Sequence, residues 1–111
     1  MSIQPWYVSQ TSPEWKLTLS VPGNPNAPDL TGRSTSDLGL VVVDVQTGAI
    51  SSGLGTFPSI YSSVSPAVVY YQPGANDLFV LNAKSYRLYV QINYPNGPDL
   101  IGPYAFTTSP L

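Results

Sequence analysis

Apolar and polar residues alternate with a period of two over several stretches of the chain, which is the pattern of half-buried β-strands. Residues 85–94 show it most clearly, because one side of this stretch carries only aromatic or aliphatic residues (Tyr86, Leu88, Val90, Ile92 and Tyr94). Residues 15–21 alternate in the same way, and residues 38–45 form a nearly continuous apolar run typical of a central strand. No stretch keeps the helical period of 3.6, and the nearest helix candidate is the short segment 77–83. The pattern therefore predicts an all-β protein.

Segments rich in Gly, Pro, Asn and Ser separate further predicted strands, which cover residues 3–9, 56–62, 67–71 and 101–108. Residues 22–32 and 50–55 are expected to be loops. About seven short antiparallel strands at regular spacing indicate an immunoglobulin-like β-sandwich, formed by a single domain that covers residues 1–111. A small β-barrel is the alternative, because period-two alternation does not distinguish the two architectures.

The chain also contains two segments of nearly the same sequence. Residues 25–32 read Pro-Asn-Ala-Pro-Asp-Leu-Thr-Gly, and residues 95–102 read Pro-Asn-Gly-Pro-Asp-Leu-Ile-Gly. Each follows an amphipathic strand that begins with an aromatic residue, a base and a leucine. We therefore expect the chain to use one device twice, in which an amphipathic strand runs into a turn closed by Asp-Leu-x-Gly.

Composition adds that this is a folded domain with an unusually uncharged surface. The chain is 42% hydrophobic and 12% aromatic, which is enough to build a core, but only 9% of its residues are charged, against roughly 25% in an average soluble domain. Ser, Thr, Asn and Gln supply most of the polarity, and these side chains are easier to remove from water than charged ones. A subunit buried in a larger assembly would have such a surface, and so would an ordinary β domain of low charge.

Several partner classes are made improbable by the same counts. Four basic residues are scattered along the chain (Lys16, Arg33, Lys84 and Arg87), whereas nucleic-acid binding needs several on one face. No apolar run approaches the ~18 residues of a membrane span. The first residues lack a basic segment followed by an apolar one, so no signal peptide is expected. There is no cysteine, which excludes disulfides.

Candidate catalytic and metal-binding residues are limited to six carboxylates, because the chain has no histidine. Asp29 and Asp99 occupy matching positions of the repeated segment and are the most suggestive pair for glycoside hydrolysis. The competing interpretation is that each caps its own turn. Asp37 or Asp44 meeting Asp29 would suit calcium, but no closely spaced carboxylate run exists. We therefore expect no catalytic residue, no cofactor and no metal ligand.

Aromatic residues are the better candidates for a functional surface. Adjacent tyrosines in a strand face opposite sides, so some of the eight tyrosines must point outward. We predict an interface that includes Trp6, Tyr61, Tyr70 and Tyr89. The alternative is that these rings form cross-strand pairs that only stabilise the sheets.

The order of these motifs resembles the N-terminal immunoglobulin-like domain of phage baseplate upper proteins and related small tail proteins. The resemblance is carried by a Trp-led strand before Asp29-Leu30-Thr31-Gly32, an apolar central strand, Val69-Tyr70-Tyr71, a turn at Asp77, Tyr86-x-Leu88-x-Val90, a turn at Asn96-Gly97 and a final strand with Phe106-Thr107. Lys84-Ser85 stand where that family usually has glycine before the late tyrosine. The resemblance implies a stand-alone domain with an assembly role in the virion and no catalytic residues.

We therefore expect a structural or adaptor subunit of a phage virion, in the tail or baseplate, that acts by protein–protein contact. Its expected partners are other virion proteins and further copies of itself, without nucleic acid or membrane, and its expected location is the virion, assembled in the host cytoplasm. A head decoration or neck protein is equally compatible with the composition. A carbohydrate-binding module that uses Trp6 and the tyrosines as stacking platforms is the alternative from another class.

Overall fold

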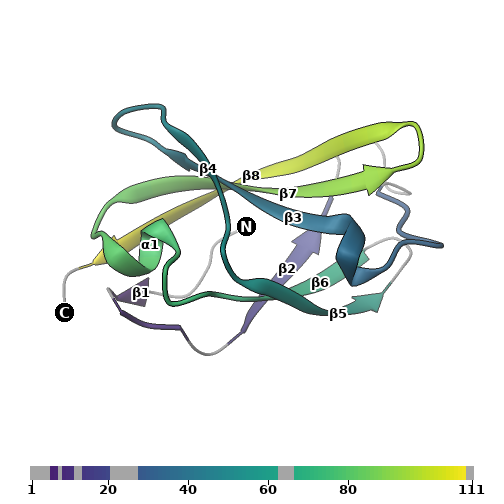
Figure 1. Cartoon of the computed structure of the whole chain (residues 1–111), viewed down its shortest axis with the longest axis horizontal. Coiled ribbons are helices and arrows are strands. Elements are labelled where there is room, and N and C mark those ends of the chain that lie inside the picture. The colour runs from purple at the N-terminus through teal and green to yellow at the C-terminus, as the bar shows by residue number, and fades with distance from the viewer. Residues whose placement is uncertain (1–5, 8, 12–13, 21–27, 63–66, 110–111) are drawn as a thin grey trace.

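The computed structural model describes residues 6–7, 9–11, 14–20, 28–62 and 67–109 of the chain. These residues form eight strands, one 3-10 turn and one short helix (Figure 1). In chain order the elements are β1 (Trp6–Tyr7), β2 (Trp15–Leu19), η1 (Thr35–Asp37), β3 (Leu38–Asp44), β4 (Ile50–Ser52), β5 (Thr56–Ser62), β6 (Ala67–Gln72), α1 (Leu78–Leu81), β7 (Ser85–Tyr94) and β8 (Gly97–Ser109).

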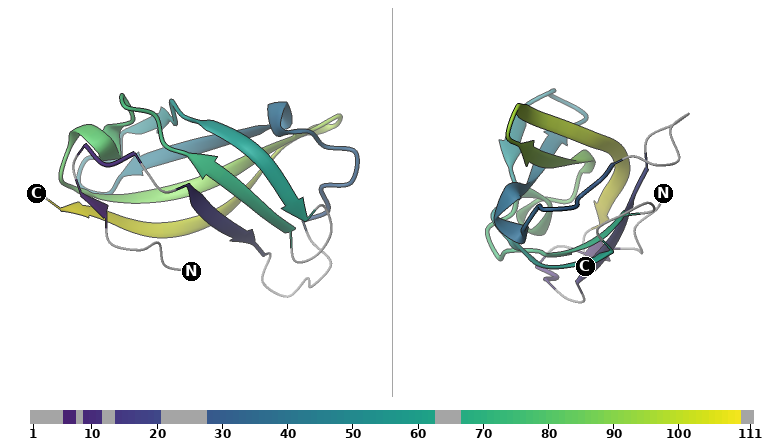
Figure 2. Two further views of the ribbon diagram at one scale, coloured as in Figure 1. Left: turned by 90° about the horizontal axis from the view of Figure 1, so that it is seen from below. Right: turned by 90° about the vertical axis from the view of Figure 1, so that its right-hand side faces the viewer.

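The strands form two sheets that pack face to face (Figure 2). One sheet has the order β1-β8-β7-β3-β4, and the other has the order β2-β6-β5. All neighbours are antiparallel except β1, which runs parallel to β8. This is the strand order of an immunoglobulin-like sandwich. The three-stranded sheet corresponds to strands B (β2), E (β6) and D (β5). In the other sheet, β4, β3, β7 and β8 correspond to strands C′, C, F and G. The predicted fold class is confirmed, and the barrel alternative is wrong because the sheets do not close.

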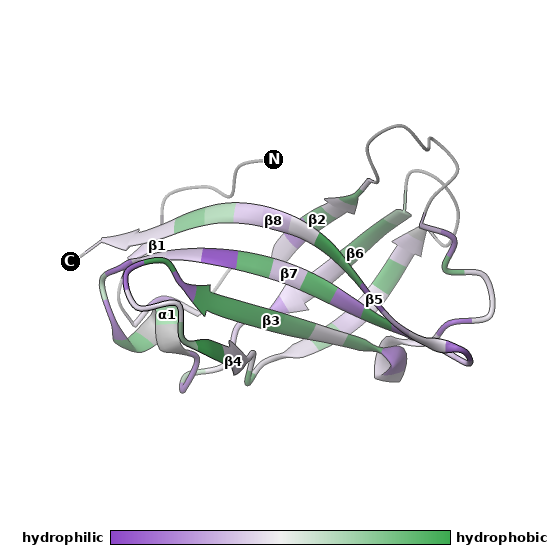
Figure 3. Cartoon of the chain, turned by 90° about the horizontal axis from the view of Figure 1, so that it is seen from above, coloured by the Kyte–Doolittle hydropathy of each residue, from purple (hydrophilic) through white to green (hydrophobic). Residues whose placement is uncertain are grey.

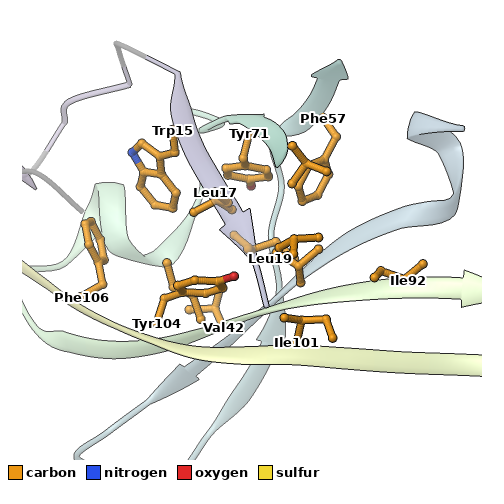
Figure 4. Packing of buried hydrophobic residues seen from close by; sticks show 14 of the residues in the cluster. Trp15, Leu17, Leu19, Val42, Phe57, Tyr71, Ile92, Ile101, Tyr104 and Phe106 are labelled. Atoms are coloured by element: carbon orange, nitrogen blue, oxygen red, sulfur yellow. The ribbon is translucent and has the colours of Figure 1, made fainter. Parts of the chain in front are cut away.

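Alternation along the strands places the core between the sheets. Along β7, Tyr86, Leu88, Val90 and Ile92 are buried, and Arg87 between them is exposed. The core cluster takes side chains from both sheets, among them Leu17, Leu19, Val42, Ile92, Ile101 and Tyr104 (Figure 4). Burial raises the pKa of the Tyr104 hydroxyl to about 12. Removing this apolar area from water is the main favourable contribution to folding.

Aromatic rings fill one end of the core around Trp15. Its ring centroid lies 4.8 Å from Phe79, 4.9 Å from Phe106 and 5.5 Å from Tyr71. Phe79 belongs to α1, so this short helix contributes to the core by covering the end of the sandwich. The segment 77–83, which was the nearest helix candidate in the sequence, contains the four residues of α1.

A second immunoglobulin-like feature lies at the start of β7. The Tyr86 hydroxyl donates a hydrogen bond of 3.4 Å to the backbone carbonyl of Asn82. This is the arrangement of a tyrosine corner, in which a tyrosine near the start of strand F bonds back to the chain a few residues upstream. In antibody domains a cysteine follows two residues later, and here that position holds the fully buried Leu88.

A bulge interrupts the pairing of β7 with β8. Leu88 is opposite Tyr104 and Val90 is opposite Ile101, so Gly102 and Pro103 together face Tyr89. The peptide bond between Gly102 and Pro103 is cis. A Cβ at Gly102 would lie 2.7 Å from the Leu88 carbonyl oxygen, so only glycine fits this approach.

Two predicted boundaries were wrong for local reasons. Residues 50–52 form β4 rather than a loop, because the Asp44 carboxylate accepts hydrogen bonds from the Gln46 and Thr47 N–H groups and closes a hairpin. β8 begins at Gly97 rather than residue 101, since a short turn at residues 95–96 leaves Gly97 opposite Tyr94. The expected strand at 3–9 is seen at Trp6–Tyr7, and it is parallel to its neighbour; residues 3–5 and 8 lie outside the described residues.

Candidate functional site

The outward positions of the five-stranded sheet form a surface that we call the outer sheet face. Neighbouring strands bring together six aliphatic or aromatic residues there, namely Val41, Val43, Ile50, Tyr89, Leu100 and Ala105. Ile50 is 74% exposed and Leu100 is 51% exposed. Arg87 lies on this face between Val43 and Ala105. Among the described strand residues that these pairings place on the outward side, it is the one charged residue.

The apolar run that predicted β3 explains this surface. β3 is apolar along most of its length, whereas the neighbouring β7 alternates (Figure 3). Leu40 and Val42 point into the core, so Val41 and Val43 must point outward. A strand that is apolar on both faces normally has both faces covered. None of the described elements covers these two valines, which are only half-buried.

The structure separates the four predicted interface residues. Trp6 is 1% exposed, and its ring packs 5.3 Å from Trp15 in a T-shaped pair. The prediction that Trp6 belongs to an exposed platform was therefore wrong. Pairing of β1 with Thr108 and Ser109 turns this ring into the core. Tyr89 lies on the outer sheet face and is half-buried.

Tyr61 and Tyr70 form a separate aromatic pair on the three-stranded sheet. Their ring centroids are 6.3 Å apart in a T-shaped arrangement. Tyr70 is opposite Lys16 on the outward side of that sheet, and the bulge between Ile60 and Ser62 leaves Tyr61 75% exposed. This pair lies on the opposite sheet from Tyr89, so the four residues do not form one surface.

The chain passes from β4 to β5, and so from one sheet to the other, between residues 52 and 56 (Figure 1). A cleft opens beside this crossover. Its volume is about 330 Å³. The floor is apolar, the rim carries hydroxyl groups, and no charged side chain lines it among the described residues; the lining is Thr35, Ser36, Leu38, Gly39, Leu40, Gly53, Gly55, Thr56, Phe57 and Tyr71. The sequence pattern did not indicate this cleft, because its walls come from three stretches that are separate in the sequence, within residues 35–40, within residues 53–57 and at residue 71.

A buried carboxylate fixes the connection that forms one wall of the cleft. Asp77 is 1% exposed. It accepts hydrogen bonds from the Leu54 N–H at 2.5 Å, the Tyr71 hydroxyl at 2.8 Å and the Gly74 N–H at 2.9 Å. The Tyr71 oxygen also accepts from the Gly55 N–H at 2.8 Å. Burial and the adjacent carboxylate raise the pKa of the Tyr71 hydroxyl far above its usual range. Asp77 therefore acts as a structural anchor for the crossover.

Asp29 and Asp99, the pair considered for glycoside hydrolysis, lie in different local structures. Asp29 Oδ1 accepts the Thr31 N–H at 2.9 Å, as the turn-capping interpretation predicted. Asp99 lies inside β8 instead of a turn, opposite Ile92. Burial raises the pKa of the Tyr94 hydroxyl, and the negative charges of Asp99 and Asp29 raise it further.

Asp37 and Asp44, each considered as a calcium ligand together with Asp29, are engaged by basic residues. Asp44 lies 3.2 Å from the Lys84 ammonium group, and Asp37 lies 3.7 Å from Arg33. Within the described part of the chain, no three potential metal-ligating side chains gather at one point.

Comparison with family models, curated proteins and solved structures gave no match for this chain. The described residues also contain no helix long and apolar enough to cross a membrane. The strand order of the chain defines it as a β-sandwich with immunoglobulin-like topology.

Proposed function

We propose that this chain is a structural subunit that assembles through the outer sheet face. The observation that carries the proposal is the juxtaposition of Val41, Val43, Ile50, Tyr89 and Leu100 with a single neighbouring charge. Apolar and aromatic enrichment with little charge is the composition of an interface centre. A stable contact removes about 800 Å² per partner from water, so the partner must cover this face and some of its surroundings.

The setting that we propose is a phage tail or baseplate, with further copies of the chain and other virion proteins as partners. The order of motifs from Asp29-Leu30-Thr31-Gly32 to Phe106-Thr107 supports this setting through its resemblance to baseplate domains. A head decoration or neck protein would use the same face. Antibody labelling of particles assembled from the encoding genome would test the setting, and labelling confined to the head would contradict the tail assignment.

Light scattering coupled to size exclusion tests the assembly itself. At micromolar concentration the unmodified chain is expected to form multimers, and Ile50→Lys combined with Leu100→Lys should return it to the monomer. Leu81→Lys is the matched control, because Leu81 is 54% exposed but belongs to α1. A monomeric unmodified chain, or an equal loss of assembly in the control, would contradict the proposal.

Carbohydrate binding is the second candidate, and the Tyr61–Tyr70 pair favours it. Tyr61 is the most exposed large apolar residue among those described, and an exposed ring is what a sugar stacks on. Retention on a polysaccharide affinity gel that is lost in Tyr61→Ala, while the Leu81→Lys control is still retained, would support this function. Equal migration of all three chains would reject it.

A further inference from the structure

The cleft between the sheets contains a free segment of strand edge as well as apolar side chains. Leu40 accepts the Gly53 N–H at 2.7 Å, so the backbone of Leu40 points away from β7 and toward the cleft. The Leu38 N–H also points away from β7, because it donates to the Thr35 carbonyl. Since the N–H and C=O of one strand residue share a side, the Leu40 N–H and the Leu38 C=O both face the cleft.

These two backbone groups have no hydrogen-bond partner among the described residues. Pairing of β3 with β4 ends at Val41 and Ser52, and beyond it the chain turns away toward β5. One donor and one acceptor therefore flank Gly39 at the wall of the cleft. An extended polypeptide segment beside Gly39 can satisfy both groups, as strands that add to a sheet edge do.

The lining of the cleft limits what such a segment can carry. Leu38, Leu40 and Phe57 provide an apolar floor, whereas Thr35 and Thr56 place hydroxyl groups at the rim. No charged residue lines the cleft within the described chain, so a charged side chain would lose its hydration without a counter-ion. A volume of about 330 Å³ lies at the small end of ligand pockets.

We propose that the cleft binds a short extended segment of a partner protein, which pairs with β3 beside Gly39 and inserts one uncharged apolar side chain over Leu40 and Phe57. This inference rests on the assembly role proposed above, since it specifies the kind of partner chain that such a subunit recognises. The outer sheet face and this cleft are separate surfaces, so each is tested independently.

The test is an amide-resolved NMR titration of the full chain with the capped tripeptide Ac-Ala-Leu-Ala-NH2. We expect saturable shifts of the Leu40, Gly53 and Gly55 amides, with a dissociation constant in the millimolar range because the probe is short. The fully N-methylated tripeptide keeps the side chain but has no N–H donor, and it should bind roughly tenfold more weakly. Replacing the central leucine by lysine should abolish the shifts.

Two protein variants locate the binding. Ser36→Trp places a bulky ring at the rim and should weaken binding at least tenfold. Ser20→Trp makes the same change at an exposed serine at the end of β2, outside the cleft, and should bind like the unmodified chain. Amides that stay unmoved at tens of millimolar peptide, or that move equally with the neutral disaccharide maltose, would overturn the proposal.

Light scattering on the same samples separates this inference from the proposed assembly. Multimers with a silent titration would reject the cleft as a peptide site and leave the outer sheet face as the means of assembly. Monomers that bind the tripeptide would support the cleft and reject assembly through the outer sheet face.

Discussion

The segments Pro28–Gly32 and Pro98–Gly102 differ in sequence only at Thr31 and Ile101, yet they adopt different structures. The first is an irregular turn in which Asp29 caps the Thr31 N–H. The second lies within β8, where Leu100 pairs with Gln91 and Ile101 pairs with Val90. What separates them is the neighbouring chain, because a short hairpin turn holds the second segment against β7. The presence or absence of a neighbouring strand to pair with therefore decides which conformation this shared sequence adopts.

The leucines at matching positions of the two segments also differ in burial. Leu30 is fully buried and belongs to the core, whereas Leu100 is 51% exposed on the outer sheet face. The side chain that follows Asp thus contributes to stability in one segment and to a surface in the other. The two segments also lie near each other, since the Tyr94 hydroxyl beside the second donates to the Asp29 carbonyl of the first at 3.0 Å.

Truncation of the two leucines should give the largest difference. Leu30→Ala leaves a cavity in the core and should reduce the free energy of unfolding by about 2–5 kcal/mol. Leu100→Ala should change it by no more than about 0.5 kcal/mol, because half of that side chain is already in water. Urea unfolding measures both, and equal losses would mean that the two segments share one environment.

Alanine at the two closing glycines should give the next largest difference. Gly102→Ala should cost about 3 kcal/mol, because its Cβ would meet the Leu88 carbonyl at 2.7 Å and its φ is +152°. Gly32→Ala should cost about 1 kcal/mol, because φ is +79° but the space is open. The same unfolding measurement checks this, and a larger loss at Gly32 would contradict the close approach of β8 to β7.

Removal of the hydrogen bond between the segments should have a smaller effect. Tyr94→Phe deletes the donor to the Asp29 carbonyl and should reduce stability by about 1 kcal/mol or less. Tyr7→Phe is a control at a tyrosine that is 43% exposed. If both variants melt alike, the contact between the segments does not contribute to stability.

The acid dependence of the first turn should give the smallest effect. Hydrogen bonds from the Thr31 side chain and backbone lower the pKa of Asp29. The stability that the ionised Asp29 carboxylate adds to the folded state is therefore present above about pH 4 and is lost as pH falls through the lowered pKa. Asp29→Asn should therefore melt below the unmodified chain at pH 7, with the difference shrinking below about pH 4. Asp99→Asn should change the melting temperature less, because strand pairing holds Asp99 in place. Thermal unfolding from pH 3 to pH 7 tests both.

Period-two alternation was sufficient to predict the sheets and much of the core. It predicted β7 at its observed bounds and the buried side of β2, because each strand has one face toward solvent and one face in the core. Alternation could not place Trp6, whose burial depends on the parallel pairing of β1 with β8 across nearly the whole chain. It also could not reveal Asp77, since its bonds to Leu54, Tyr71 and Gly74 exist only after the sheets have come together.

The anchoring of the crossover by Asp77 determines where the chain can change in length. Surface loops usually accept insertions, and residues 53–55 and 73–77 are loops by position. An added residue in either would move a donor away from the carboxylate, which is buried and would be left underbonded. The exposed tip at Gln46–Gly48 is bonded within its own hairpin through Asp44. A peptide tag or an extra domain therefore belongs at that hairpin tip, where the sandwich keeps every bond of the crossover.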